Sequence, residues 1–503
     1  MSAPGRSYPS LLLGALTLGT GWYLAQRYLP GQTSFVVQAL LFGLVLLRLS
    51  RDGVLAVSSP DRTMLAIPGA LLLAAMLWRD SETLVVLDAL AVVLLAALTV
   101  PDAAGLPLAL SGPGAYVERV ARAGAGWVLG AIPLAWCSAT TAPRAGRWRS
   151  LAAVGLGVAA VSPALLIFAA LLSSADPAFG RMLESCVAFN WRPLFPHVVG
   201  IALATWGAGG LLWAAASRPR GAALCPSGGR VGATTIFAAL GAIEALFVLY
   251  VLLQSRYLFG GYAHVLAAER MTVADYARRG FFELVTVAAL TLPIVLLADW
   301  ALDERRREDR TRFRWHVLGL VGLLYVLLGS ALSRMLLYTR EFGLTESRVY
   351  VTAFLGWLAC VFAWFALVQV RGTRERFASG AFALALQVLL LLNLLDVDGM
   401  IVRVNVARAA DGRSFDRSYV TQLGAGSLPQ VLHSAKQMPR PARCDLLREV
   451  QQRWAQEAER SPEPSWNVER ARARGVLLER LEHRTRADCG DGSPLPPIMQ
   501  DRL

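Results

Sequence analysis

Lysine is almost absent from this sequence. Lys436 is the only lysine among 49 basic residues, in a chain of 503 residues. No G-K-[ST] triplet exists, which excludes a P-loop for nucleotide phosphates, and a Schiff-base mechanism could use only Lys436. Charged residues are also scarce, at 17% against about a quarter in an average soluble protein. The composition therefore argues against a soluble globular protein.

Common catalytic and metal-binding patterns are missing as well. The sequence contains no HExxH, GxSxG or CxxC, and its histidines do not have the spacing of metal ligands. These histidines are His197, His264, His316, His433 and His483. We therefore expect no metal site and no cofactor.

Long apolar runs are what the sequence has in abundance. A helix needs about 20 apolar residues to cross the hydrocarbon of a bilayer, and lipid requires every backbone hydrogen bond to be made within the segment. The sequence predicts an all-α polytopic integral membrane bundle of about eleven spans with a small helical C-terminal tail outside the membrane. The runs are Ser10–Leu29, Thr33–Leu47, Met64–Trp78, Thr83–Val100, Leu151–Leu172, Leu194–Ala216, Val231–Leu253, Phe281–Trp300, Val317–Ser333, Tyr350–Val370 and Ala378–Leu395.

Four parts follow from these runs. Residues 1–100 hold the first four spans, 101–150 an amphipathic cytoplasmic segment at the interface, 151–395 a core of seven spans, and 396–503 the tail, whose last dozen residues we expect to be disordered. The stretch Gly124–Ala142 is apolar but is broken by Gly130 and Pro133. An interfacial helix is favoured there, and a further span is the alternative.

Arginine counts predict the orientation. With the N-terminus inside, the inner segments hold 21 arginines before Asp396 and the outer loops hold 11, which fits the positive-inside rule. The net charge of +13 thus reflects topology and contact with the lipid bilayer, so we expect no nucleic-acid partner. The prediction is a bacterial inner-membrane protein with a cytoplasmic N-terminus and an extracytoplasmic tail.

The tail carries two predicted amphipathic helices, Ala442–Arg460 and Trp466–His483. An antiparallel hairpin would bring Cys444 near Cys489, and a disulfide there would require an oxidising compartment. Two unrelated free thiols are the alternative.

Ionisable groups predict two possible sites. Within the spans, Asp88 and Glu244 could serve a transporter or a proton relay, although a buried polar pair that stabilises helix packing is favoured. On the outward face, two loops hold charges of both signs, which could bind a phosphate or a carboxylate or could pair with neighbouring acids and lipid headgroups. The outward residues are Arg256, Arg278, Arg279, Glu283, Arg334, Arg340, Glu341, Glu346 and Arg348.

Several strings in these segments resemble a bacterial polytopic membrane family known only as a domain of unknown function, of the 4153/4173 type. The similarity runs from about the fourth span to the second tail helix and is greatest from Gln254 onward. It implies an integral membrane protein, with no established catalytic residue to carry over. The strings are SRYLFGG, YARRGFFEL, EFGLTESRVY, NVARAADGRSFDRSYVTQLGAGSLPQVL and SWNVERARAR.

Three functions stay open from the sequence. The favoured one is a non-enzymatic envelope scaffold, regulator or complex subunit whose tail binds an envelope protein partner. The first alternative is a small-solute transporter that uses Asp88 and Glu244. The second is a membrane enzyme that acts on an anionic or lipid-linked envelope substrate at the outward residues.

Overall fold

The computed structural model of the protein describes residues 8–134, 195–217, 233–260, 281–302, 307–460, 466–474 and 478–490, apart from positions 30, 103, 132 and 414 and residues 56–58. Every regular element among them is a helix, so the predicted all-α fold is confirmed. The chain forms two compact units. The first contains residues 1–78, 85–224 and 463–467, and the second contains residues 79–84, 225–462 and 468–503.

Seven described helices are long and apolar enough to cross a membrane. They are α2 (Gly31–Arg51), α3 (Ser59–Trp78), α9 (Phe195–Ala216), α13 (Phe281–Ala301), α14 (Arg307–Phe342), α15 (Glu346–Arg371) and α16 (Phe377–Leu394). Three more predicted spans coincide with α1 (Tyr8–Tyr28), α4 (Glu82–Ala97) and α10 (Ala233–Gly260). The predicted span Leu151–Leu172 lies outside the described residues. The chain is a polytopic membrane protein, and its eleven spans stay a prediction.

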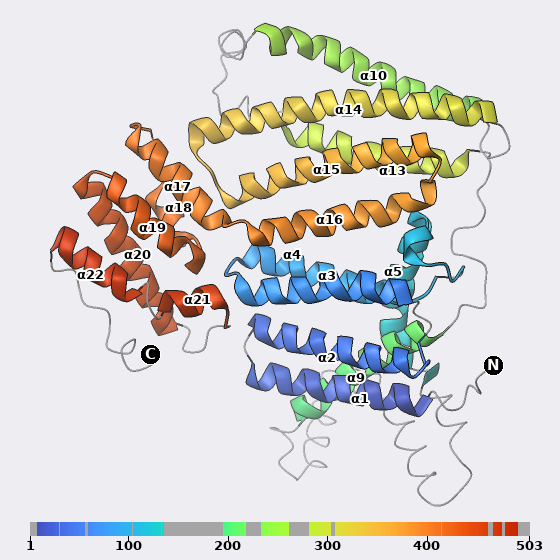
Figure 1. The fold of residues 1–503 in the computed structure, drawn as a ribbon, viewed down its shortest axis with the longest axis horizontal. Coiled ribbons are helices and arrows are strands. Elements are labelled where there is room, and N and C mark those ends of the chain that lie inside the picture. Colours follow the sequence, from blue (N-terminus) through green and yellow to red (C-terminus); the bar gives the residue numbers. More distant parts are fainter. Residues whose placement is uncertain are drawn as a thin grey trace, which may run out of the picture. The chain divides into compact units, whose positions relative to one another are not determined.

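Small residues hold the helices of the first unit together. There α1 packs against α2 and α9, and α5 (Pro113–Leu129) packs against α9 (Figure 1). A Cβ atom added to Gly130 would lie 2.5 Å from the carbonyl oxygen of Gly210, so the two backbones are in contact. Close approach of this kind is a main source of helix association where water does not drive it.

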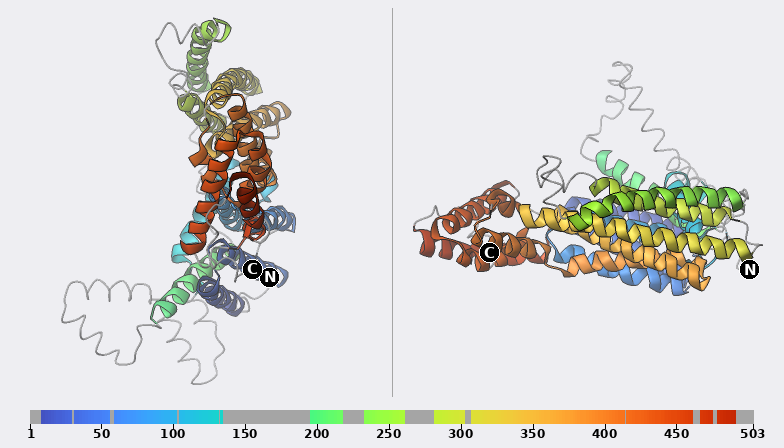
Figure 2. Two further views of the ribbon diagram at one scale, coloured as in Figure 1. Left: turned by 90° about the vertical axis from the view of Figure 1, so that its left-hand side faces the viewer. Right: turned by 90° about the horizontal axis from the view of Figure 1, so that it is seen from above.

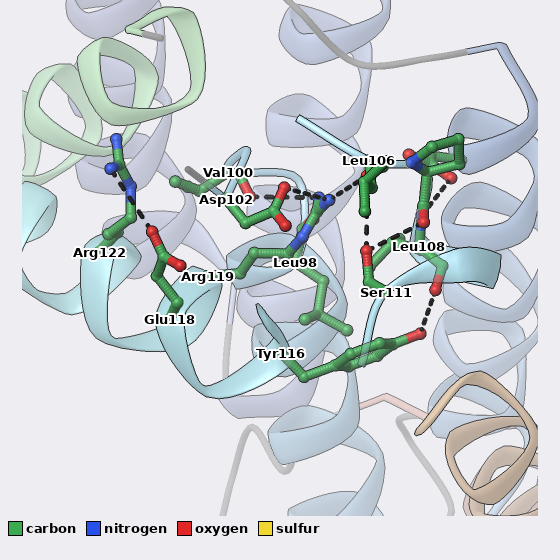
Figure 3. Close-up of polar contacts among 12 residues, drawn as sticks. Leu98, Val100, Asp102, Leu106, Leu108, Ser111, Tyr116, Glu118, Arg119 and Arg122 are labelled. Carbon is green, nitrogen blue, oxygen red and sulfur yellow. Dashed lines mark hydrogen bonds and ion pairs between the residues drawn. The ribbon is translucent and has the colours of Figure 1, made fainter. Parts of the chain in front are cut away.

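The connection between α4 and α5 is held by hydrogen bonds to one guanidinium group, that of Arg119 (Figure 3). Arg119 donates hydrogen bonds to the carbonyl oxygens of Leu98, Val100 and Leu106. It also pairs with the carboxylate of Asp102 at 3.0 Å, and the two side chains are only 5% and 2% exposed. Burial of this ion pair is tolerated because both terminal nitrogen atoms of the guanidinium donate hydrogen bonds.

One turn earlier on α5, Tyr116 closes the same connection. Its hydroxyl donates to the carbonyl oxygen of Leu108 at 3.1 Å, and burial raises the pKa of Tyr116 to about 12, so the phenol stays a donor at neutral pH. The amphipathic stretch Ala115–Ala123 is therefore fixed as part of α5. The rest of Gly124–Ala142 beyond residue 134 lies outside the described residues, so the interfacial role of 101–150 stays a prediction.

The second unit contains a layer of long helices, α10, α13, α14, α15 and α16, with the tail at one end (Figure 2). Phe313 and Phe362 are the largest side chains of its apolar core. Helix α14 has 36 residues and is about 54 Å long, well beyond the 30 Å of hydrocarbon. The sequence pattern predicted only Val317–Ser333, because charged residues interrupt the apolar run at both ends of α14.

Arginines gather at the end of this layer that lies opposite the tail. The carboxylate of Asp299 is 2.7 Å from Arg310 and 3.3 Å from Arg374. These ion pairs join the α13–α14 connection to the α15–α16 connection. The basic loops of the second unit thus share one end of the helices, and the tail lies at the other end (Figure 1).

The tail has more helices than the two predicted. They are α17 (Val397–Ala410), α18 (Arg417–Gln422), α19 (Leu428–Ser434), α20 (Arg440–Arg460), α21 (Val468–Arg472) and α22 (Leu478–Cys489). Their buried side chains, which include Ile401, Leu446, Leu447, Trp454 and Leu481, form one core together with Leu84, Val349 and Leu392 of α4, α15 and α16.

The second predicted tail helix differs most from the structure. It is divided between α21 and α22, and it ends at Cys489 rather than at His483. In the last turns of α22, the hydroxyl of the buried Thr485 donates to the carbonyl oxygen of Leu481 at 2.8 Å. The sulfur atoms of Cys444 and Cys489 are bonded, which joins α20 to α22.

We expect Gly126→Ala to destabilise the first unit. The new Cβ would lie 2.5 Å from the Cβ of Ala214, and overpacking of this kind costs about 1–3 kcal/mol. Gly124→Ala is the matched control, since a Cβ there meets nothing within 4 Å and alanine favours a helix by about 1 kcal/mol. Thermal unfolding in detergent should give a lower midpoint for the first variant only. Equal midpoints would contradict the close approach.

Candidate functional site at the base of the tail

A charged turn between α3 and α4 is the centre of a polar cluster in the second unit. Arg79 donates to the carbonyl oxygens of Asn393 at 2.7 Å and Leu394 at 3.1 Å. A helix leaves its last carbonyl groups without partners and has negative character at that end. The guanidinium of Arg79 therefore caps the C-terminus of α16. Its remaining contact is with the carboxylate of Glu469 at 2.6 Å.

The next residue, Asp80, bonds to two segments of the tail. Its backbone N–H donates to Glu469 at 2.9 Å, and its carboxylate is 2.7 Å from Arg470. The second carboxylate oxygen accepts the backbone N–H of Ala425 at 3.0 Å. Both sides of this turn are thus occupied by residues that lie more than 300 positions away in the sequence.

The loop that receives Asp80 needs glycine on both sides of Ala425. A Cβ on Gly424 would lie 2.2 Å from the carbonyl oxygen of Asp80, and one on Gly426 would lie 2.8 Å from the Glu469 carboxylate. Any larger side chain would push these groups apart. The GAG triplet within the tail string is therefore explained by the approach of two charged groups to the backbone.

A pair of carboxyl groups lies beside this turn. Asp398, near the start of α17, is buried and forms a hydrogen bond with Glu346, the first residue of α15. Burial, together with the charge of Glu346, raises the pKa of Asp398 to about 8. A carboxyl group that is buried beside another acid does not ionise readily, so Asp398 keeps its proton at neutral pH.

Two tyrosines complete the surroundings of this pair. The hydroxyl of Tyr419 accepts the backbone N–H of Glu346 at 2.8 Å, and burial raises the pKa of Tyr419. The hydroxyl of Tyr350 lies 3.1 Å from the hydroxyl of Ser81. Neutral hydroxyl groups next to Glu346 add no further negative charge to a site that already contains several acids.

The turn between α14 and α15 is fixed to α17 by side chains on the tail. Asn405 exchanges two hydrogen bonds of 2.8 Å with the backbone of Leu344. Arg408 donates to the carbonyl oxygens of Arg340 and Glu341, and Arg413 donates to that of Arg340. The C-terminal carbonyl groups of α14 are thus satisfied by arginines of the tail.

The structure places the predicted outward residues in different surroundings. Arg340 and Glu341 point their side chains to the exterior, and only their backbones bind the tail. Arg348 donates to the carbonyl oxygens of Phe342 and Gly343 and stacks on Tyr338. Glu346 alone joins the acidic cluster, and Arg334 is half-buried. The side chains that lie outside the described residues are those of Arg256, Arg278, Arg279 and Glu283.

The predicted intramembrane residues lie in different units. Asp88, on α4, is fully buried in the first unit. Glu244, on α10 in the second unit, lies 2.9 Å from Nδ1 of His316 on α14. This pair borders a hollow of about 520 Å³ that Arg312 and Trp315 also line. Sequence reasoning did not connect Glu244 with His316, because they are 72 positions apart.

Sequence reasoning also missed the centre of the cluster. Arg79 and Asp80 sit in a short loop, and Glu469 and Arg470 sit in the string SWNVERARAR. The only available signal was the group of charged residues Arg79, Asp80 and Glu82, which lies between two apolar runs. Among the described residues, no three histidine, cysteine, aspartate or glutamate side chains group as a metal site.

Comparison with protein families places these features in one sequence family. The model of a domain of unknown function (DUF4153) matches residues 66–433. The chain belongs to this family. The DUF4153 match begins within α3 and ends at the end of α19, so it includes Asp80, Glu346 and Asp398. Glu469 and the string SWNVERARAR lie beyond it. No curated protein and no solved structure matches the chain.

The protonated carboxyl predicts a dependence of stability on pH. A folded pKa raised to about 8 means that the folded state binds the proton more tightly than the unfolded state. The stabilisation is complete below the unfolded pKa and is lost as the pH rises through 8. Between about pH 6 and pH 8 the unfolding free energy should fall by at most about 1.4 kcal/mol per pH unit.

Asp398→Asn removes this titration and keeps a donor for Glu346. Its unfolding midpoint should exceed that of the parent at about pH 8 and should vary less with pH. Asp411→Asn is the control, because Asp411 lies exposed at the other end of α17. Scanning fluorimetry in detergent measures all three proteins. A parent with the same pH slope as Asp398→Asn would show that Asp398 is ionised in the folded state.

Proposed function

We propose that this chain is a non-catalytic scaffold or complex subunit of the bacterial inner membrane, whose helical tail lies on the extracytoplasmic side and binds an envelope protein. The observation that carries the proposal is the way the tail is attached. Its helices share one apolar core with the adjoining ends of α15 and α16, and the charged groups at its base are bonded to one another and to the ends of α14 and α16. Such a base holds a binding surface in a fixed position.

Two features support an extracytoplasmic tail. The bond between Cys444 and Cys489 suits an oxidising compartment. The arginines around Asp299 lie at the other end of the second unit, and arginine-rich connections stay in the cytoplasm. Both features support the same side of the membrane for the tail.

Cysteine labelling in intact cells tests this orientation. In a variant without the other four cysteines, a membrane-impermeant maleimide should label Cys444 and Cys489 only after reduction, because the disulfide protects both thiols. Labelling that requires cell lysis, with or without reductant, would show a cytoplasmic tail and would end this proposal. The cysteines to be replaced are Cys137, Cys186, Cys225 and Cys360.

Photo-crosslinking in living cells tests the partner. A photoreactive residue at Gln452, which is exposed on α20, should give an adduct of defined mass with an envelope protein. The same residue at Glu375, which is exposed at the opposite end of the second unit, should not give that adduct. Identical adducts from both positions, or none from the tail, would contradict a partner-binding tail.

Proton-coupled transport is the second candidate, and the pair of Glu244 and His316 beside a hollow favours it. Transporter sites use ionisable groups within the membrane. Under the scaffold proposal, Glu244→Gln should leave the proton permeability of proteoliposomes unchanged. Asp88→Asn is measured in parallel, since Asp88 is the other acid within a predicted span. A flux carried by the parent protein and lost in Glu244→Gln would favour transport over scaffolding.

A further inference from the structure

A basic hollow of about 510 Å³ lies on the tail, away from the acidic cluster. One wall comes from α19 and the short 3-10 turn after it, with His433 and Lys436. The other wall comes from α22, with Arg480, His483 and Arg484. On each wall these residues are three or four positions apart, so each segment turns one face toward the hollow.

The described residues do not balance the charge of the hollow. Asp488 is its only acidic residue, and its carboxylate already lies 3.5 Å from both Arg443 and Arg484. Among the described residues, neither Lys436 nor Arg480 forms an ion pair. Like charges around a concave surface raise the local potential and favour an anionic ligand.

Other exposed arginines of the tail show the contrast. Arg417 pairs with Asp445 at 2.6 Å, and Arg486 pairs with Glu482 one turn earlier on α22. These two exposed arginines are neutralised by nearby acids, whereas Lys436 and Arg480 in the hollow have no ion-pair partner among the described residues.

We infer that this hollow binds a phosphate group. Arginine guanidinium groups bind phosphate through paired N–H donors, and lysine adds a point charge. The histidine rings supply further nitrogen atoms that donate hydrogen bonds. The phosphate belongs either to a lipid headgroup or to a soluble or polymeric phosphate. The inference rests on the proposed function only for its envelope setting, since the binding is a property of the folded tail.

The single lysine makes the hollow directly measurable. Lys436 is the only lysine, so acetylation by an uncharged N-hydroxysuccinimide ester, followed by mass spectrometry, reports on this site alone among the side chains. Inorganic pyrophosphate should slow this acetylation in the full-length protein by about tenfold at about ten times its Kd. Sodium chloride of equal ionic strength should not do so, because screening alone does not occupy the site.

Two variants separate binding from general charge. Arg480→Gln keeps Lys436 as the reporter and should weaken protection by pyrophosphate about tenfold, the effect of one charged hydrogen bond. Arg417→Gln removes one exposed arginine elsewhere on the tail and should leave protection unchanged. Absence of protection in the parent, equal protection by chloride, or equal loss in both variants would overturn the inference.

Nanodiscs distinguish the two sources of phosphate. Slower acetylation in discs with phosphatidylglycerol than in discs of phosphatidylcholine, lost in Arg480→Gln, would identify a lipid headgroup. Protection by pyrophosphate with equal rates in both discs would identify a soluble or polymeric phosphate. A cytoplasmic tail in the cysteine-labelling experiment would end the proposed envelope role and leave protection of Lys436 as it is, so the two failures are distinguishable.

Discussion

The contacts of Arg79 and Asp80 are the interaction on which the base of the tail depends. Arg79 satisfies the last carbonyl groups of α16 and binds Glu469, while Asp80 binds Ala425 and Arg470. Two tail segments, the Ala425 turn and α21, and one membrane helix therefore meet at two consecutive residues. A buried charge is stable only when its partners are in place, so each of these segments holds the others in position.

The acidic pair next to this turn also contributes to the attachment of the tail. Asp398 and Glu346 lie together because α17 starts where α15 starts, and the proton held by Asp398 removes the repulsion between them. The tail is thus attached through carbonyl groups, arginines and a protonated acid, all of which are committed to internal bonds. A ligand must therefore bind at the outer surface of the tail, where Lys436 and Arg480 form no ion pair with a described residue.

Much of the fold could be read from the sequence, since lipid imposes a simple rule on it. A run of about 20 apolar residues must be a helix, and ten of the predicted runs coincide with described helices. The ends of the helices could not be read in the same way. Helix α14 continues to Phe342 because Arg408 and Arg413 of the tail satisfy its terminal carbonyl groups, and no local pattern contains that information.

The candidate site was less accessible than the fold. The sequence identified Glu346 as part of an outward polar cluster, and it singled out the string that contains Glu469 only as a family resemblance. Asp80 and Asp398 carry no periodic signal, because a single charged residue in a loop looks the same whether it is solvated or buried. The pairing of Glu244 with His316 was likewise hidden by the distance between α10 and α14 in the chain.

The sequence by itself determined that the chain is helical, that it belongs in a membrane and that no P-loop can exist in it. These properties depend on composition and on local runs, which lipid reads directly. Only the tertiary structure decided which charged residues meet, which of them keep a proton and which are left for a ligand. Those properties depend on distances between segments such as Asp80 and Glu469, and such distances are set by packing of the whole unit.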